Sequence, residues 1–206
     1  MEIVSNFIQQ SITIFAIMDP IGISALALSL LSPNITKTQI STIARKSTLT
    51  IIIAFFVVLI TGDAILKIFG IGENSIKVMG GIILLMMAIA MVNGNSKKSK
   101  NDDNKSDEDL AIIPIGIPIA FGAGLFTTII IFKHNANTLV DLVSITLAFC
   151  INAFLFYLIL KNSIYIKKLL GATGQSVVTR LMGLIVGAIA VQFIISGIVN
   201  LTKVYL

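Results

Sequence analysis

An aspartate and a proline stand side by side in the middle of a long apolar segment near the start of the chain. Asp19 and Pro20 are followed by Gly22, and the surrounding stretch 7–31 is otherwise apolar enough to cross a bilayer. A carboxylate at the centre of a membrane helix costs about 2.5 to 3.5 kcal/mol on insertion scales, and proline opens the helix beside it by removing a backbone donor. Such a carboxylate is suited to exchanging a proton, coordinating a cation or meeting a substrate ammonium.

The same residues also have structural explanations, which stay open at this point. Asp19 is able to cap the half-helix that begins at Pro20 by accepting backbone N–H groups, and capping is compatible with a functional role. Two further glycines, Gly122 and Gly124, interrupt a later apolar segment. Together with Pro20 and Gly22, they either free backbone groups, so that a helix N-terminus faces a substrate carboxylate, or allow close helix packing.

Four neutral polar side chains at membrane depth complete the candidate site for substrate or coupling ion. They are able to line a pathway or to bond a substrate amino group. Threonine hydroxyls commonly bond back to their own helix, which favours a structural role for two of the four. The four residues are Thr127, Thr128, Asn152 and Gln192.

The composition identifies the elements that must position these residues as membrane helices. Hydrophobic residues make up 56% of the 206 residues and charged residues 12%, against about 25% charged in soluble domains. Mean hydropathy is +0.98, and the apolar runs lack the alternation of barrel strands. We therefore predict an all-α membrane protein. Six spans of roughly 20 residues or more are expected, over residues 7–31, 45–68, 75–93, 111–132, 139–160 and 177–202.

A polar segment divides the chain into two halves. Residues 93–109 contain no apolar side chain and carry four lysines against five acids, a composition that cannot bury enough surface to fold. We expect a cytoplasmic linker over 94–110 between three-span units at 1–93 and 111–206. Eleven of the 15 Lys and Arg residues fall on the linker side, which predicts both termini outside and a multi-pass plasma membrane protein. The net charge of +5 reflects this orientation and does not indicate nucleic-acid binding.

The two halves share sequence features. Residues 77–81 (KVMGG) and 180–184 (RLMGL) each open an apolar run, and a glycine-containing turn precedes each one, at 70–72 and 171–174. We expect Lys77 and Arg180 to reach opposite membrane surfaces. A unit of three spans must point the opposite way when it is repeated. The halves therefore predict an inverted 3+3 repeat with broken first and fourth spans, an arrangement in which transporters bind substrate near the midplane.

Enzyme chemistry finds little support in the sequence. His134 is the single histidine and Cys150 the single cysteine, so neither a paired metal motif nor a hydroxyl–histidine pair is available. No phosphate-binding loop of the Walker type is present. We expect no enzymatic activity and no metal site.

Several short motifs stand out along the chain: 19–22 (DPIG), 69–71 (FGI), 77–82 (KVMGGI), 122–124 (GAG) with Thr127 and Thr128, and 180–184 (RLMGL) continuing to 188–193 (AIAVQF). Together they resemble the MarC family of six-span membrane proteins. The family includes neutral amino acid transporters of the SnatA type and is similar to the LysE group of exporters. The resemblance implies transport of a small solute such as glycine or alanine.

We therefore predict a secondary transporter or exporter of small neutral amino acids that alternates access at a site between spans one and four. Its expected partners are the substrate and the lipid bilayer, and a homo-oligomer is compatible with them. A coupling proton or sodium ion is the one accessory species we expect, with Asp19 as its binding group. Two alternatives stay open: an exporter of a cation or another small solute, and a membrane assembly factor that transports nothing.

Overall fold

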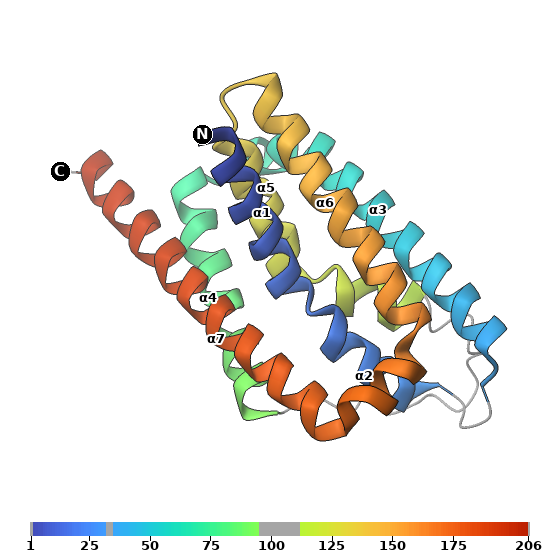
Figure 1. Ribbon diagram of the computed structural model, residues 1–206. Coiled ribbons are helices and arrows are strands. Elements are labelled where there is room, and N and C mark those ends of the chain that lie inside the picture. The colour runs from blue at the N-terminus through green and yellow to red at the C-terminus, as the bar shows by residue number, and fades with distance from the viewer. Residues whose placement is uncertain (1, 32–34, 95–111, 206) are drawn as a thin grey trace.

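Every regular element in the described part of the chain is a helix (Figure 1). The computed structural model describes residues 2–31, 35–94 and 112–205, so the predicted linker lies outside the described residues apart from Gly94. The all-helical prediction is confirmed. The elements are α1 (Glu2–Met18), α2 (Pro20–Leu30), α3 (Lys37–Ile68), α4 (Glu73–Asn93), the π-helix η2 (Ile112–Ala120), α5 (Ala123–His134), α6 (Leu139–Lys161) and α7 (Ser163–Tyr205).

Among the described residues, five stretches are long and apolar enough to cross a membrane, where the sequence predicted six spans. The predicted fourth span is the exception, because it consists of η2 followed by α5 of 12 residues. At 1.5 Å per residue α5 is about 18 Å long, which is less than the roughly 30 Å of a hydrocarbon core. Pro114 and Pro118 explain the interruption, since neither supplies the N–H that an α-helix needs. The five are Val4–Leu30, Lys37–Ile68, Glu73–Asn93, Leu139–Lys161 and Ser163–Lys203.

Residues with positive φ mark the breaks and turns. Asp19, between α1 and α2, has a φ of 41° and is the only non-glycine residue with positive φ in the described residues. Gly70, in the turn before α4, has a φ of 64°. Gly171 has a φ of 63° and kinks α7 near its start. Both segments that the sequence predicted as glycine turns therefore contain a glycine with positive φ, which glycine adopts without strain.

The packing forms two long helix pairs with the broken helices between them. α4 packs along α7, α3 packs against α6, and the α1–α2 segment contacts α6 and α7. The second broken segment, η2 with α5, packs against α3 and α4. In Figure 1 the N- and C-terminal ends lie toward the same end of the molecule, and the corner between α6 and α7 lies at the other. A ring stack between Phe55 and Phe149, with centroids 4.0 Å apart, joins α3 to α6 in the core.

Glycines let α4 and α7 approach until backbone meets backbone. A Cβ added at Gly81 would lie 2.8 Å from the Ala190 carbonyl oxygen, and one at Gly197 would lie 2.9 Å from the Asn74 carbonyl oxygen. Lipid chains are as apolar as leucine, so helices in a membrane associate through such close packing rather than through the hydrophobic effect. The α4–α7 pair is therefore specified by small residues.

We predict that Gly81→Ala destabilises the protein by about 1 to 3 kcal/mol, because a methyl group there collides with backbone that has no room to move. The measurement is thermal unfolding of the purified protein in detergent. Gly187→Ala is the matched control on the same interface, since its Cβ would lie 3.5 Å from the Ala88 side chain, an ordinary contact. Equal melting temperatures for the two variants would contradict this account of the interface.

Candidate functional site

Two cavities lie at opposite ends of the same helices. The first, here called the Asp19 cavity, has a volume of about 540 Å³ and is lined by α2, the end of α4 and the first third of α7. The second, the Lys77 cavity, has a volume of about 360 Å³ and is lined by the first half of α1, the start of α4, the end of α5 and the later part of α7. Along α4, Lys77 lines one cavity, and Met87 and Gly94 line the other.

Packed side chains separate the two cavities. Ile17 at the end of α1, Leu84 in the middle of α4 and Val186 in α7 belong to one buried cluster and are at most 3% exposed. Each of them lies, along its helix, between residues that line the two cavities. The protein is therefore closed at its centre and hollowed from both ends.

Asp19 stands where the Asp19 cavity reaches the break between α1 and α2. Its Oδ1 accepts the Gly22 N–H at 3.1 Å, so the carboxylate caps α2, and the Thr179 hydroxyl of α7 donates a second hydrogen bond to it. Pro20 is the first residue of α2 and lacks the N–H that would need a partner there. The capping role considered from the sequence is thus present, while Asp19 also lines a cavity.

Gly22 is required by the position of the carboxylate. A Cβ at this residue would lie 2.0 Å from Asp19 Oδ2 and 2.6 Å from Thr179 Oγ1. Any side chain would push the carboxylate away from the N–H that it caps or away from Thr179. Asp19, Gly22 and Thr179 therefore form one unit.

Sequence reasoning missed two polar residues of α7 that line the Asp19 cavity. Thr179 bonds Asp19, and the buried Gln175 donates from Nε2 to the Ser24 hydroxyl at 3.3 Å. Ser24 in turn donates to the Ile21 carbonyl oxygen at 2.7 Å. Their spacing of four residues places Gln175 and Thr179 on one face of a helix. This four-residue spacing of polar side chains at the start of the predicted sixth span was a signal available in the sequence.

The second broken segment begins α5 without a side-chain cap. Gly122 is the N-cap residue in extended conformation, and it lines a mostly apolar groove between α3 and α5. Gly124 is buried, and a Cβ there would lie 2.8 Å from Leu84 and 3.6 Å from Ile17. The start of α5 therefore contacts the end of α1 close to the Asp19 break, although the two glycines do not line the Asp19 cavity.

The remaining predicted site residues are dispersed. Thr127 and Thr128 donate to the Ala123 and Gly124 carbonyl oxygens at 2.7 and 2.8 Å, so their hydroxyls bond back to their own helix as expected. Asn152 is buried and donates to the Ser11 carbonyl oxygen at 3.1 Å, which ties α6 to α1. Gln192 lines the Lys77 cavity. The structure thus groups Asp19, Pro20 and Gly22, and separates the other predicted residues from them.

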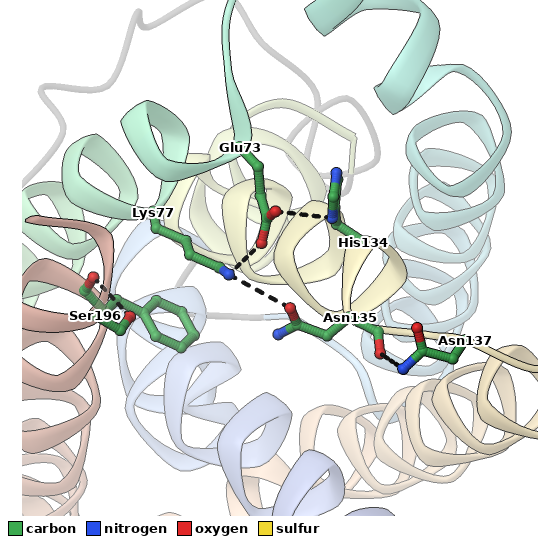
Figure 2. Close-up of polar contacts among 7 residues, drawn as sticks. Glu73, Lys77, His134, Asn135, Asn137 and Ser196 are labelled. Carbon is green, nitrogen blue, oxygen red and sulfur yellow. Dashed lines mark hydrogen bonds and ion pairs between the residues drawn. The ribbon is translucent and has the colours of Figure 1, made fainter. Parts of the chain in front are cut away.

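A charged cluster borders the Lys77 cavity (Figure 2). Lys77 does not project to the surface as expected: it is 9% exposed, forms an ion pair with Glu73 and donates to Asn135 Oδ1 at 3.4 Å. His134 Nδ1 lies 3.0 Å from the other Glu73 oxygen. Nearby, Lys133 and Asp63 form an ion pair at 2.7 Å that joins α5 to α3. Within the described residues, no three His, Cys, Asp or Glu side chains gather as they would around a metal ion.

Comparison with known proteins assigns the chain to a family. A model of the MarC family of integral membrane proteins matches residues 4–202. A UPF0056 membrane protein of Aquifex aeolicus is 31% identical over 205 residues, which cover 96% of this chain and 94% of that protein. The UPF0056 membrane protein YhcE of Escherichia coli is 28% identical over 196 residues, covering 91% and 89%. A relative in Methanocaldococcus jannaschii is 29% identical, covering 93% and 95%.

No solved structure matches the chain. The family match and the relatives extend over nearly its whole length, and they agree with the apolar helices of the fold. The chain belongs to the MarC family of integral membrane proteins.

Proposed function

We propose that this protein is a secondary transporter of small neutral amino acids, which alternates access between the Asp19 cavity and the Lys77 cavity. The observation that carries the proposal is the closed centre between two cavities that start from opposite ends of the same helices. A pore would be open throughout, and a protein without a transport role has no need of two facing cavities. Alternating access requires a substrate region that each cavity reaches in turn.

The inverted 3+3 repeat is part of the proposal, with six membrane crossings that count η2 and α5 as one broken span. The alignment that pairs residue 77 with residue 180 also pairs Met91 with Ile194. In the α4–α7 contact, Gly81 lies against Ile194 and Gly183 lies against Met91. The alignment pairs Gly81 with Leu184, the neighbour of Gly183, so the two contacts are reciprocal to within one residue, as an approximate two-fold axis would make them. The positive φ of both Gly70 and Gly171, each ahead of a corresponding apolar run, supports the same repeat.

The orientation that we propose places both termini outside, the linker in the cytoplasm and the protein in the plasma membrane. The Lys77 cavity then opens to the outside and the Asp19 cavity opens to the cytoplasm. Both termini lie toward the same end of the molecule in Figure 1, which supports an even number of membrane crossings. The bias of Lys and Arg toward the linker side supports the direction.

The two half-helix starts offer complementary chemistry to an amino acid. The α2 start is capped by Asp19, whose carboxylate suits a substrate ammonium or a coupling proton or sodium ion. The α5 start has no side-chain cap, so its first N–H groups and the positive end of its dipole suit a substrate carboxylate. The contact between Gly124 and Ile17 brings these two starts close together. The α5 start does not line the Asp19 cavity, so we propose that a small zwitterion meets both starts when it reaches the centre between the two cavities.

Transport itself is tested by counterflow of labelled glycine and alanine into proteoliposomes that contain the purified protein. We expect uptake that unlabelled neutral amino acids inside the vesicles accelerate, because a carrier that returns loaded exchanges faster than it returns empty. Empty liposomes are the control. Absence of flux with folded protein would refute the proposal and favour an assembly role. Flux of a cation alone would favour the exporter alternative.

We predict that Asp19→Asn folds normally but lowers the rate of counterflow at least tenfold. Asparagine keeps the N-cap and tolerates the left-handed backbone, so the change removes the charge and spares the structure. Asp63→Asn is the matched control, because Asp63 pairs with Lys133 at the edge of the helices. Unchanged rate and unchanged pH dependence in Asp19→Asn would remove Asp19 from the proposed site.

We predict that Gly22→Ala reduces transport as strongly as Asp19→Asn, since its methyl group would occupy the position of Asp19 Oδ2. The variant is compared with Gly187→Ala, whose added methyl group makes an ordinary contact. Counterflow and thermal unfolding are measured on the same preparations. A Gly22→Ala protein that transports like the wild type would mean that the carboxylate does not act from the position described here.

A further inference from the structure

We propose that the Lys77 cavity is a second binding site for the same zwitterionic substrate, in which the Lys77 ammonium binds the substrate carboxylate in place of Glu73. The inference rests on the proposed function, because it takes small neutral amino acids as the ligand class. It adds a second site, in the cavity that lies across the closed centre from Asp19. The transported molecule occupies this site before or after it passes the centre.

The first step of the inference is the burial of a charge. Lys77 is 9% exposed, and an ammonium with so little water needs a counter-charge and hydrogen-bond acceptors. Glu73, one turn earlier on α4, supplies the counter-charge. Asn135 supplies an acceptor at 3.4 Å, which is long for a hydrogen bond. Lys77 therefore has a counter-charge, but its hydrogen bond to Asn135 is weak.

The second step is that Glu73, the counter-charge of Lys77, also contacts His134. One carboxylate oxygen of Glu73 faces Lys77, and the other lies 3.0 Å from His134 Nδ1 (Figure 2). The Glu73 side chain is 23% exposed and that of His134 is 48% exposed, so both reach water. When a ligand carboxylate arrives at Lys77, Glu73 keeps a hydrogen-bond partner and solvent. The exchange of one carboxylate for another at Lys77 therefore leaves no buried charge unpaired.

The third step concerns an acidic residue that lines the same cavity. Asp141, in the first turn of α6, also lines it. The Asn137 N–H, the Thr138 N–H and the Thr138 hydroxyl all donate to Oδ2 of Asp141, at 3.0, 2.9 and 2.9 Å, which leaves Oδ1 to accept from a ligand. The lining of the cavity thus carries both a cation and an anion. It also includes amide side chains, from Asn6, Gln9, Gln10 and Gln192.

This distribution of charge selects a class of ligand. A simple anion would meet Asp141 and a simple cation would meet Lys77, whereas a molecule with a carboxylate at one end and an ammonium at the other suits both charged groups. Amide groups bond either end. A volume of about 360 Å³ holds glycine or alanine together with several waters, each of which takes about 30 Å³.

The test is direct binding of labelled glycine to the full-length protein purified in detergent. We expect Lys77→Gln to weaken glycine binding at the Lys77 cavity at least tenfold, because the ammonium that binds the glycine carboxylate is lost. We expect Glu73→Gln to tighten that binding several-fold, because the competing carboxylate is lost. Lys203→Gln, at an exposed lysine near the end of α7, is the matched control and binds as the wild type does.

The opposite signs separate a binding role from a structural one. If the ion pair only stabilises the fold, both variants lower the melting temperature and neither tightens binding, and that result overturns the inference. Asp141→Asn keeps a side chain able to cap α6 and is expected to weaken binding of glycine while leaving competition by acetate unchanged. An Asp141→Asn protein that binds glycine as the wild type does would also count against the site.

The two proposals fail in distinguishable ways. If the transport proposal is wrong, the wild-type protein shows neither counterflow nor glycine binding. If only the second site is wrong, the wild type transports, Asp19→Asn impairs transport, and Lys77→Gln binds glycine as the wild type does. Glycinamide, which lacks the carboxylate, is the probe for the contact itself: it is expected to compete at least tenfold more weakly than glycine in the wild type and equally with glycine in Lys77→Gln.

Discussion

The hydrogen bond from the Gly22 N–H to the Asp19 carboxylate is the interaction on which the rest of the architecture depends. A membrane offers no water to a broken helix, so each backbone group released by a break needs a partner within the protein. Asp19 supplies that partner with its own side chain and turns the chain through a left-handed residue. The polar group that the break requires is also the one that gives the cavity its charge.

The two broken segments solve the same problem in different ways. α2 begins with a charged cap and a proline, and α5 begins with glycine and no side-chain cap. The α2 start therefore attracts positive charge, and the α5 start offers backbone N–H groups that donate hydrogen bonds. This difference makes the two half-helix starts chemically unequal.

Much of the fold was predictable from the sequence, because apolar runs, proline and glycine act locally. The membrane helices and the two glycine turns appear close to where the sequence placed them. The extension of α3 back to Lys37 follows from a capping box between Thr36 and Gln39, a local signal that a search for apolar residues passes over. The π-helix was not predictable in kind, since the sequence shows only that Pro114 and Pro118 interrupt an α-helix.

The site was less predictable than the fold, because its members come from segments far apart in the chain. Asp19 and Gly22 are distinctive in an apolar span, but the Thr179 hydroxyl reaches them only through the packing of α7 against α2. Lys77 was misread for the same reason: a lysine near the end of a membrane helix usually extends to water, and here α5 places Asn135 over it.

The backbone contact between α4 and α7 has a mechanical consequence. Where side chains separate two helices, rotamer changes can absorb small displacements, but carbonyl oxygens packed against Cα atoms have no such freedom. The α4–α7 pair is therefore a rigid unit against which the short half-helices pack. A movement that opens one cavity and closes the other has to involve α1, α2, η2 and α5, which contact this pair mostly through side chains. It cannot consist of α4 and α7 sliding along each other.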